Sequence, residues 1–244
     1  MTVTTTGLTK AAGVAAAAAG AMFIGVQIGH PQLNLTTITS TNVLIRDCFK
    51  VLMCPLAVAG LSGMYLSQVR RNGVLGLVGY LVLAAGYLSI MCTTFLAAFV
   101  APTLAGTNPG FVKDVIALAT SRGTVTGDVG ALSTVWKVQG ILYLAGGVLF
   151  GIALFRAHVL ARWATVLLAI GGGVSIALNF MPDAFYRFLA YPNAIAMMGL
   201  GVSLWLTQRK VSSVDTSSVE TGSVGTSASP AVVPAARVEP STAR

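Results

Sequence analysis

The sequence predicts an all-α membrane protein: a polytopic bundle of about six transmembrane helices, with one short interfacial helix at its outer surface. Hydrophobic residues make up 55% of the 244 residues, and the mean hydropathy is +0.81. Only 9% of the residues are charged, whereas soluble domains carry about 25%. Long apolar runs also recur along the chain, separated by short basic turns.

Six apolar runs have the length that a helix needs to cross a bilayer, roughly 20 residues, because lipid offers no partner to an unpaired backbone amide. Prolines stand just beyond three of the run ends, where a residue without an N–H does least harm. A short segment, residues 1–10, precedes the predicted bundle of residues 11–206. We expect spans at residues 11–29, 43–67, 74–101, 133–155, 163–180 and 189–206.

The first run has an alternative interpretation as a cleaved signal peptide. It contains a run of alanines at 15–19, and Ala17, Ala19 and Ala21 supply the A-x-A pattern of a cleavage site. The apolar character nevertheless continues through Val26. We therefore favour a retained span, and the orientation of the other spans is the same in either case.

The basic residues of the short turns predict the orientation. If the N-terminus is cytoplasmic, the inner turns contain no acidic residue, and the long connection 102–132 lies outside. The positive-inside rule then places both termini in the cytoplasm. The inner basic residues are Lys10, Arg70, Arg71, Arg156, Arg162, Arg209 and Lys210.

The long outer connection contains a predicted amphipathic helix. Asn108-Pro109-Gly110 is a turn signal, and the residues after it separate into two faces. We expect this helix to cover the outer end of the bundle, and a lid over a ligand site is the alternative. The apolar face carries Phe111, Val112, Val115, Ile116, Leu118 and Ala119, and the polar face carries Lys113, Asp114 and Thr120.

Residues 207–244 form a predicted disordered cytoplasmic tail. They are rich in Ser, Thr, Val, Pro and Ala, and such a segment buries too little apolar surface to offset the entropy lost on ordering. A short repeat recurs at 213–216, 218–221 and 223–226. A docking or phosphorylation segment is the alternative interpretation.

Small residues predict how the spans associate. Gly25 and Gly29, and likewise Gly147 and Gly151, have the GxxxG spacing that lets two helices approach closely. Packing within one chain is the simpler interpretation. A homo-oligomer formed through one of these faces is the alternative.

Polar residues of several spans converge on the predicted outer end. Arg46 and Lys50 share one helix face, and Asp47 is close enough to pair with Lys50. Charged residues at membrane depth usually face the bundle interior or water, although long basic side chains near a span end also extend simply to the interface. The candidate polar vestibule consists of His30, Arg46, Asp47, Lys50, Lys137, Gln139, Asn179, Asp183 and Arg187.

The sequence offers no catalytic, metal or cofactor site. His30 and His158 fall on opposite sides of the predicted membrane, and Cys48, Cys54 and Cys92 lack the spacing of metal ligands. No acidic residue lies deep in a span, which removes paired carboxylates. The formal charge of +8 comes mostly from residues at span ends, so it indicates contact with lipid headgroups and not with nucleic acid.

One turn resembles a known family. From Phe155 to Trp163 the chain reads FRAHVLARW, and the next residues read ATVLLAIGG. This turn resembles that of an uncharacterised family of six-helix membrane proteins common in actinobacteria, in which proline commonly precedes the Arg-Trp pair where this chain has Ala161. The resemblance implies a six-helix membrane fold. It implies no catalytic residue, because that family has no established activity.

These observations favour a non-enzymatic integral membrane protein of the cell membrane, acting as a structural or partner-binding bundle in contact with membrane lipids. A small-solute permease or channel that uses the vestibule is the first alternative. A membrane enzyme acting on lipid is the second, with Arg46, Lys50 and Lys137 holding an anionic headgroup. The missing general acid and base count against it.

Overall fold

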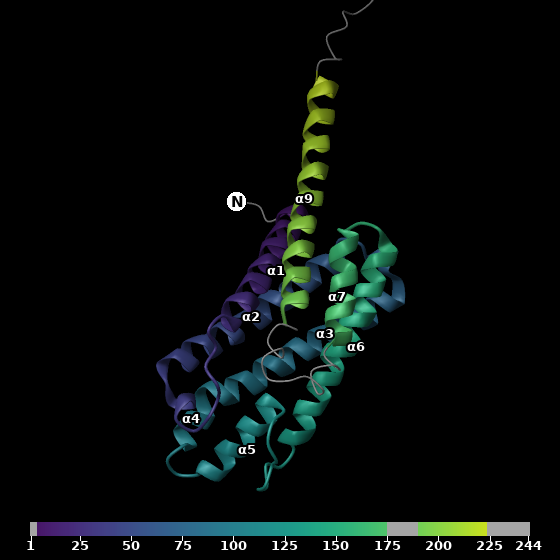
Figure 1. The fold of residues 1–244 in the computed structure, drawn as a ribbon. Helices are drawn as coiled ribbons and strands as arrows, with labels where there is room; N and C mark the ends of the chain where they lie inside the picture. The colour runs from purple at the N-terminus through teal and green to yellow at the C-terminus, as the bar shows by residue number, and fades with distance from the viewer. Residues whose placement is uncertain (1–3, 175–189, 224–244) are drawn as a thin grey trace, which may run out of the picture. The chain divides into compact units, whose positions relative to one another are not determined.

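The computed structural model describes residues 4–174 and 190–223, with side chains up to Arg209. Its regular elements are all helices (Figure 1), which confirms the all-α class. The helices are α1 (Thr5–Gln27), α2 (Thr41–Leu66), α3 (Val69–Phe95), α4 (Ala101–Leu104), α5 (Pro109–Thr120), α6 (Leu132–Ala157), α7 (Arg162–Val174) and α9 (Ala190–Ser223), with the short turns η1 (Thr37–Thr39) and η2 (Leu96–Val100).

Contacts between residues divide the chain into two compact units, residues 1–209 and 210–244. The helical bundle lies within the first unit. Helix α9 ends at Ser223, beyond the predicted end of the sixth span at residue 206. Helix α9 thus includes residues 207–223 of the predicted tail, residues 224–244 lie outside the described residues, and the disorder of the tail stays a prediction.

Among the described residues, three helical segments are long and apolar enough to cross a membrane: Thr5–Gln27, Val69–Leu104 and Leu132–Ala157. The second joins α3, η2 and α4 into one run of 36 residues. These segments correspond to the predicted spans 11–29, 74–101 and 133–155. Membrane crossing by α2, α7 and α9 stays a prediction, and residues 175–180 of the predicted fifth span lie outside the described residues.

Helices α1 and α2 are antiparallel and pack through very small residues. Gly60 of α2 lies against Ala16 of α1, and Gly63 lies against Ala12. Residue numbers therefore run in opposite directions along the pair. Such close approach gives dispersion contacts between backbones, which hold helices together where lipid removes the hydrophobic drive.

Helices α3 and α6 form a second antiparallel pair. A Cβ on Gly79 would lie 2.5 Å from the amide nitrogen of Phe150, and a Cβ on Gly86 would lie 2.9 Å from that of Tyr143. Because this spacing excludes any side chain larger than hydrogen, glycine fixes the register of the pair.

The predicted GxxxG spacings have different surroundings. Gly147 and Gly151 face Gly172 and Ala169 of α7, so this pair packs within the chain. Gly25 has no atom within 4 Å of its Cβ position. Gly29 lies beyond the end of α1 at φ +60°, so the first spacing is not one continuous helical face.

The antiparallel order brings the basic turns to one end of the bundle, which we call the basic end. There, Arg162 stacks over the ring of Phe155 and Arg209 over that of Trp205, at 4.6 and 4.7 Å. We call the other end the acidic end, because it carries the described acidic side chains, which are Asp47, Asp114 and Asp128. This asymmetry agrees with the predicted orientation, and the sidedness in a membrane stays a prediction.

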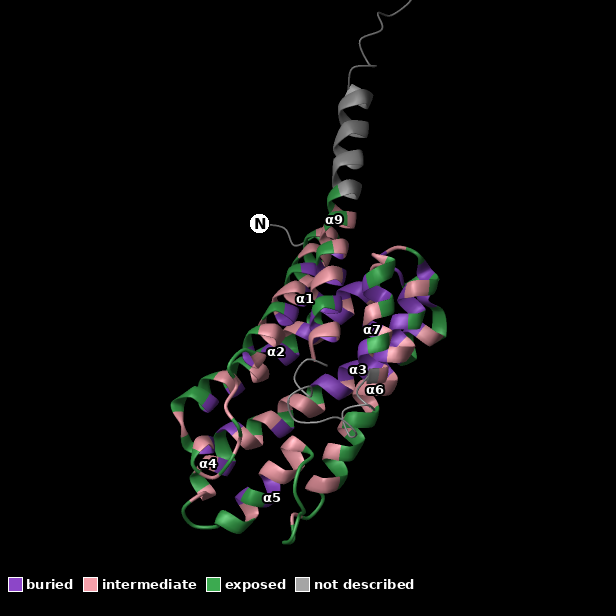
Figure 2. Ribbon diagram, in the orientation of Figure 1, coloured by how far each residue is buried: buried purple, intermediate pink, exposed green. Residues whose placement is uncertain are grey.

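The buried residues lie mostly where helices face one another (Figure 2). Many large apolar side chains, among them Ile45, Leu81 and Ile141, are exposed. The main buried cluster joins α1, α2, α3, α6, α7 and α9, and Leu61, Phe150 and Leu200 are fully buried in it. A smaller cluster of Ile38, Ala101, Val112 and Val115 attaches α5 to α4 and to the loop before α2. Large exposed apolar side chains are what a lipid-facing surface requires.

The predicted short helix in the long connection is present as α5, and its N-terminus is capped by the Asn108 side chain. The prediction for Asp114 is wrong. Asp114 is not on an exposed polar face but is 3% exposed, and its carboxylate accepts hydrogen bonds from the amides of Thr126 and Gly127 at 2.9 and 2.8 Å. The loop after α5 supplies these donors. Thr126 and Gly127 follow Asp114 by 12 and 13 residues, so the helical pattern of α5 does not predict the pairing.

Candidate functional site

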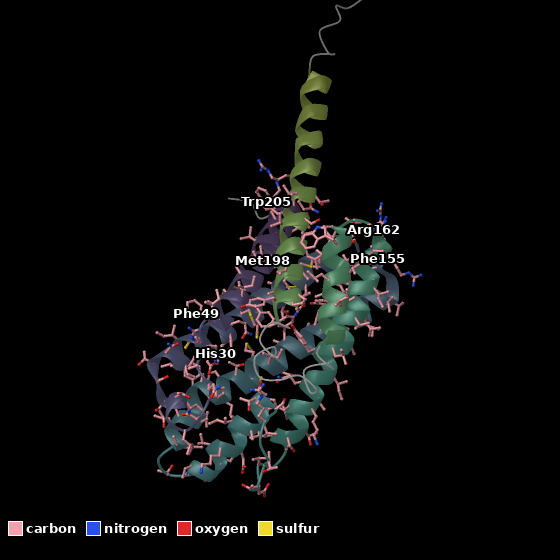
Figure 3. All side chains as sticks on the ribbon, in the orientation of Figure 1. His30, Phe49, Phe155, Arg162, Met198 and Trp205 are labelled. Atoms are coloured by element: carbon pink, nitrogen blue, oxygen red, sulfur yellow. The ribbon has the colours of Figure 1, made fainter. Side chains whose placement is uncertain are left out.

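The candidate site lies where the loop after α1 meets the start of α2, and we call His30, Arg46, Asp47 and Lys50 the outer polar cluster. Helix α2 begins after Ser40, whose hydroxyl accepts a hydrogen bond from the amide of Val43. This cap fixes the first turns of α2 and hence the direction of the charged side chains. Figure 3 shows His30 and Phe49 near the acidic end and Phe155 and Arg162 near the basic end.

Lys50 contacts two of the three other residues of the cluster, Asp47 and His30. Its Nζ lies 2.8 Å from Asp47 Oδ1 and 3.0 Å from His30 Nε2. His30 Nδ1 lies 2.8 Å from the carbonyl oxygen of Pro31. Because a carbonyl oxygen only accepts, these partners assign the proton to Nδ1 and leave Nε2 to accept from the ammonium group.

The predicted pairing of Asp47 with Lys50 is therefore present, and the two partners differ in exposure. The Asp47 side chain is 5% exposed, whereas that of Lys50 is 23% exposed. A nearly buried carboxylate is stable in its charged form only next to a cation. Lys50 thus neutralises Asp47 and at the same time reaches solvent.

Arg46 is held by the end of α1. Its Nη1 donates to the carbonyl oxygens of Val26 and Ile28 at 3.1 and 2.7 Å, and its Nε donates to Asn42 Oδ1 at 2.6 Å. The last carbonyls of a helix lack intrahelical partners and carry partial negative charge, so a guanidinium group stabilises them. Arg46 forms no ion pair with any carboxylate among the described residues.

A groove of about 550 Å³ runs beside Arg46, between α1 and α2. Its walls are mostly apolar, and the polar groups at its side are Arg46 and Asn42. Ile45 and Phe49 are half exposed along it. The lining residues are Met22, Gly25, Val26, Asn42, Ile45, Arg46 and Phe49.

The structure does not bring every predicted vestibule residue to this place. Lys137 is exposed on α6 and forms no hydrogen bond or ion pair with the outer polar cluster among the described residues. Gln139 instead accepts a hydrogen bond from Thr93 of α3 at 2.7 Å. Asn179, Asp183 and Arg187 lie outside the described residues.

Sequence reasoning missed several buried polar groups inside the bundle. Asn193 of α9 is 3% exposed, and its amide donates to the Tyr87 hydroxyl at 3.4 Å. Gln68 and Asn72, at the α2–α3 turn, are 4% and 5% exposed, and their amide atoms have no hydrogen-bond partner within the described part of the chain. The available signal was an amide side chain within or beside an apolar run.

The outer polar cluster has the chemistry of a binding site. It presents cations held in fixed positions beside an apolar surface, and its carboxylate is already paired with Lys50. The described part of the chain contains no group of His, Cys, Asp or Glu that could hold a metal ion. The arrangement suits an anionic or amphipathic ligand.

Comparison with known proteins found no match to a family model, to a curated protein or to a solved structure.

Proposed function

We propose that this chain is a multi-pass integral membrane protein that crosses the cell membrane six times, with both termini in the cytoplasm. We further propose that it is not an enzyme and that it binds a partner at the membrane through the outer polar cluster. Membrane lipids are the first class of partner. The resemblance of the turn 155–163 to a six-helix family agrees with the proposed six crossings.

The antiparallel order of the helices supports six crossings. If α1, α3 and α6 span the membrane, α2 must return between α1 and α3, because its own contacts run antiparallel to α1 along its length. Helix α7 packs antiparallel to α6, and the part of α9 up to Arg209 packs antiparallel to α1. The basic end then faces the cytoplasm, where the positive-inside rule requires it.

The fixed position of Arg46 is the observation that carries the binding function. Three hydrogen bonds hold its guanidinium group against the end of α1 and against Asn42. A cation ordered before a ligand arrives binds more tightly, because the entropy of ordering is already lost. A catalytic group would need an available acid or base, whereas the Asp47 carboxylate is engaged by Lys50.

Cysteine labelling tests the placement of the cluster. In a background without Cys48, Cys54 and Cys92, single cysteines replace Thr107, in the connection before α5, and Arg156, at the basic end. A membrane-impermeant maleimide added to intact cells should label Thr107→Cys alone, and Arg156→Cys only after permeabilisation. Labelling of Arg156→Cys in intact cells would overturn the proposed orientation.

Photo-cross-linking tests the partner binding. A photoreactive amino acid at exposed Thr36, in the loop before α2, should give a discrete cross-linked species in cells. The substitution Lys50→Met should abolish this species. The same group at Arg156 serves as the control. A cross-linking pattern at Thr36 that Lys50→Met leaves unchanged would contradict a role for the cluster in binding.

A further inference from the structure

We infer that the groove between α1 and α2 holds one acyl chain of an anionic phospholipid, and that Arg46 binds its phosphate. This inference deepens the function proposed above and rests on its placement of the groove in the membrane. The ligand is a lipid of the surrounding bilayer, taken up from the side, and not a free anion.

The shape and lining of the groove fit a hydrocarbon chain. Met22, Val26, Ile45 and Phe49 line its length, and its volume is about 550 Å³. Among the described residues, no atom lies within 4 Å of the Cβ position of Gly25, so the absence of a side chain there keeps the groove open. By contrast, the Cβ positions of Gly60 and Gly63 in α2 are met by Ala16 and Ala12 of α1.

Arg46 has one terminal nitrogen left for a ligand. Nε and Nη1 are engaged by Asn42, Val26 and Ile28, whereas Nη2 makes no hydrogen bond among the described residues. The other bonds fix the guanidinium plane and so orient Nη2. A guanidinium nitrogen donating to a phosphate oxygen forms a charge-assisted hydrogen bond, which is stronger than one between neutral groups.

The charges of the outer polar cluster favour a lipid with net negative charge. Lys50 and Asp47 neutralise each other at 2.8 Å, and Arg46 forms no ion pair with a carboxylate among the described residues. Arg46 therefore carries the net charge of the cluster, and one phosphate balances it. A zwitterionic headgroup would add an ammonium group, whereas the described carboxylate of this cluster, Asp47, is already paired with Lys50.

The groove and the Arg46 side chain lie at the depths that the acyl chain and the phosphate of a lipid occupy. Helix α1 is a candidate span that ends at Gln27, so Met22, Gly25 and Val26 occupy its last two turns. Arg46 bonds the carbonyls of Val26 and Ile28, which places its charge at the end of the span. Going outward from the membrane interior, the apolar groove comes first and the Arg46 cation second. The acyl chain and the phosphate of a lipid have the same order.

Native mass spectrometry of the full chain in detergent tests this inference, with short-chain phosphatidylglycerol and phosphatidylcholine as probes. Wild-type protein should bind phosphatidylglycerol more tightly than phosphatidylcholine. Arg46→Gln should weaken phosphatidylglycerol binding by roughly tenfold and remove the preference. Gly25→Leu should weaken binding of both lipids, because it fills the groove while keeping the bonds of Arg46.

Lys137→Gln is the matched control, since it removes an exposed cation of the same end outside the groove, and it should bind both lipids like wild type. Binding by Arg46→Gln and Gly25→Leu that equals wild type would overturn the inference. Competition by inorganic phosphate at equal concentration would also overturn it, because it would show an anion site without the acyl chain. Cysteine labelling reports the membrane orientation separately, so the two proposals fail independently.

Discussion

At the residue scale, Asp47 depends on its ion-pair partner Lys50. It is 4% exposed in the first turns of α2, and Lys50 is its ion-pair partner. A carboxylate at that burial is destabilising once its cation is removed, because desolvation is no longer offset. The pair is therefore a test of how deeply the cluster is buried.

Replacement of Lys50 by Met should lower the free energy of unfolding by about 1–3 kcal/mol, since the partner carboxylate stays buried without a cation. The double variant Asp47→Asn with Lys50→Met should be more stable than Lys50→Met alone. Thermal unfolding in detergent of the wild type, both single variants and the double variant measures this. Small additive effects would instead indicate two solvated side chains that merely reach the interface.

Asp114 predicts a local pH dependence. Hydrogen bonds from the backbone amides of Thr126 and Gly127 hold the pKa of this carboxyl below its ordinary value of 3.8. Because the folded-state pKa is the lower one, the stabilisation is fully present above the ordinary value and is lost as the pH falls through the folded-state pKa.

Amide hydrogen exchange of the loop 121–131 checks this dependence. Protection of Thr126 and Gly127, corrected for the intrinsic rate, should fall when the pH is lowered from about 6 to about 2.5. Asp114→Asn should show weak protection at both pH values. Equal protection of the wild type at both would mean that the carboxylate does not hold the loop.

Two glutamines, Gln68, which is buried, and Gln139, which is partly buried, allow a comparison of their amides. Neither amide atom of Gln68 has a hydrogen-bond partner among the residues that the structure describes, whereas Gln139 accepts from Thr93 at 2.7 Å. Gln68→Met should leave the free energy of unfolding unchanged or raise it by about 1 kcal/mol, because it removes an unsatisfied polar group. Gln139→Met should lower it by about 0.5–1.5 kcal/mol. Thermal unfolding in detergent measures both, and a large loss for Gln68→Met would reveal a bound water or ligand at its amide.

At the element scale, glycine decides how close the helices approach. A Cβ on Gly60 of α2 would lie 2.5 Å from the Cβ of Ala16, whereas a Cβ on Gly140 of α6 meets no atom within 4 Å. Gly60→Ala should lower the free energy of unfolding by about 1–3 kcal/mol through overpacking. Gly140→Ala should raise it by up to about 1 kcal/mol, because alanine is the better helix former.

Thermal unfolding of the two alanine variants, measured side by side, separates packing from helix propensity. The same substitution is expected to have opposite signs at the two sites. A stabilising Gly60→Ala would show that α1 does not pack on α2 as closely as the structure has it.

Helix α5 shows what an element's sequence can and cannot specify. Its turn signal and apolar side predicted the helix, and Val112 and Val115 are buried as that pattern requires. The burial of Asp114 was not predictable from its periodicity. The carboxylate is satisfied by a loop that follows more than ten residues later in the chain, and only the fold brings the two together.

At the scale of the whole molecule, the bundle and the segment after Arg209 are separate units. Deletion of residues 210–244 should leave the melting temperature of the detergent-purified bundle unchanged, because that Ser- and Thr-rich segment has little apolar surface to bury on it. The full-length chain is the control in the same detergent. A large drop in the melting temperature would show that the tail stabilises the bundle.

The candidate site was predictable in part. The spacing of Asp47 and Lys50 within one helix predicted their pairing, because residues three apart on a helix are neighbours. The partners of Arg46 were not predictable, since the carbonyls of Val26 and Ile28 lie twenty and eighteen residues away in sequence. Gln139 was assigned to the same vestibule by its depth alone, and its partner proved to be Thr93.

The sequence by itself determined that the protein is helical, that long apolar runs reach the length of a membrane span and that the basic residues collect in the turns between them. Those properties depend on residues adjacent in the chain or on average hydropathy. Only the tertiary structure decided which glycines face another helix, which amides are buried without partners and that Gly25 leaves a groove beside Arg46. These depend on the register of antiparallel neighbours, which no single helix specifies.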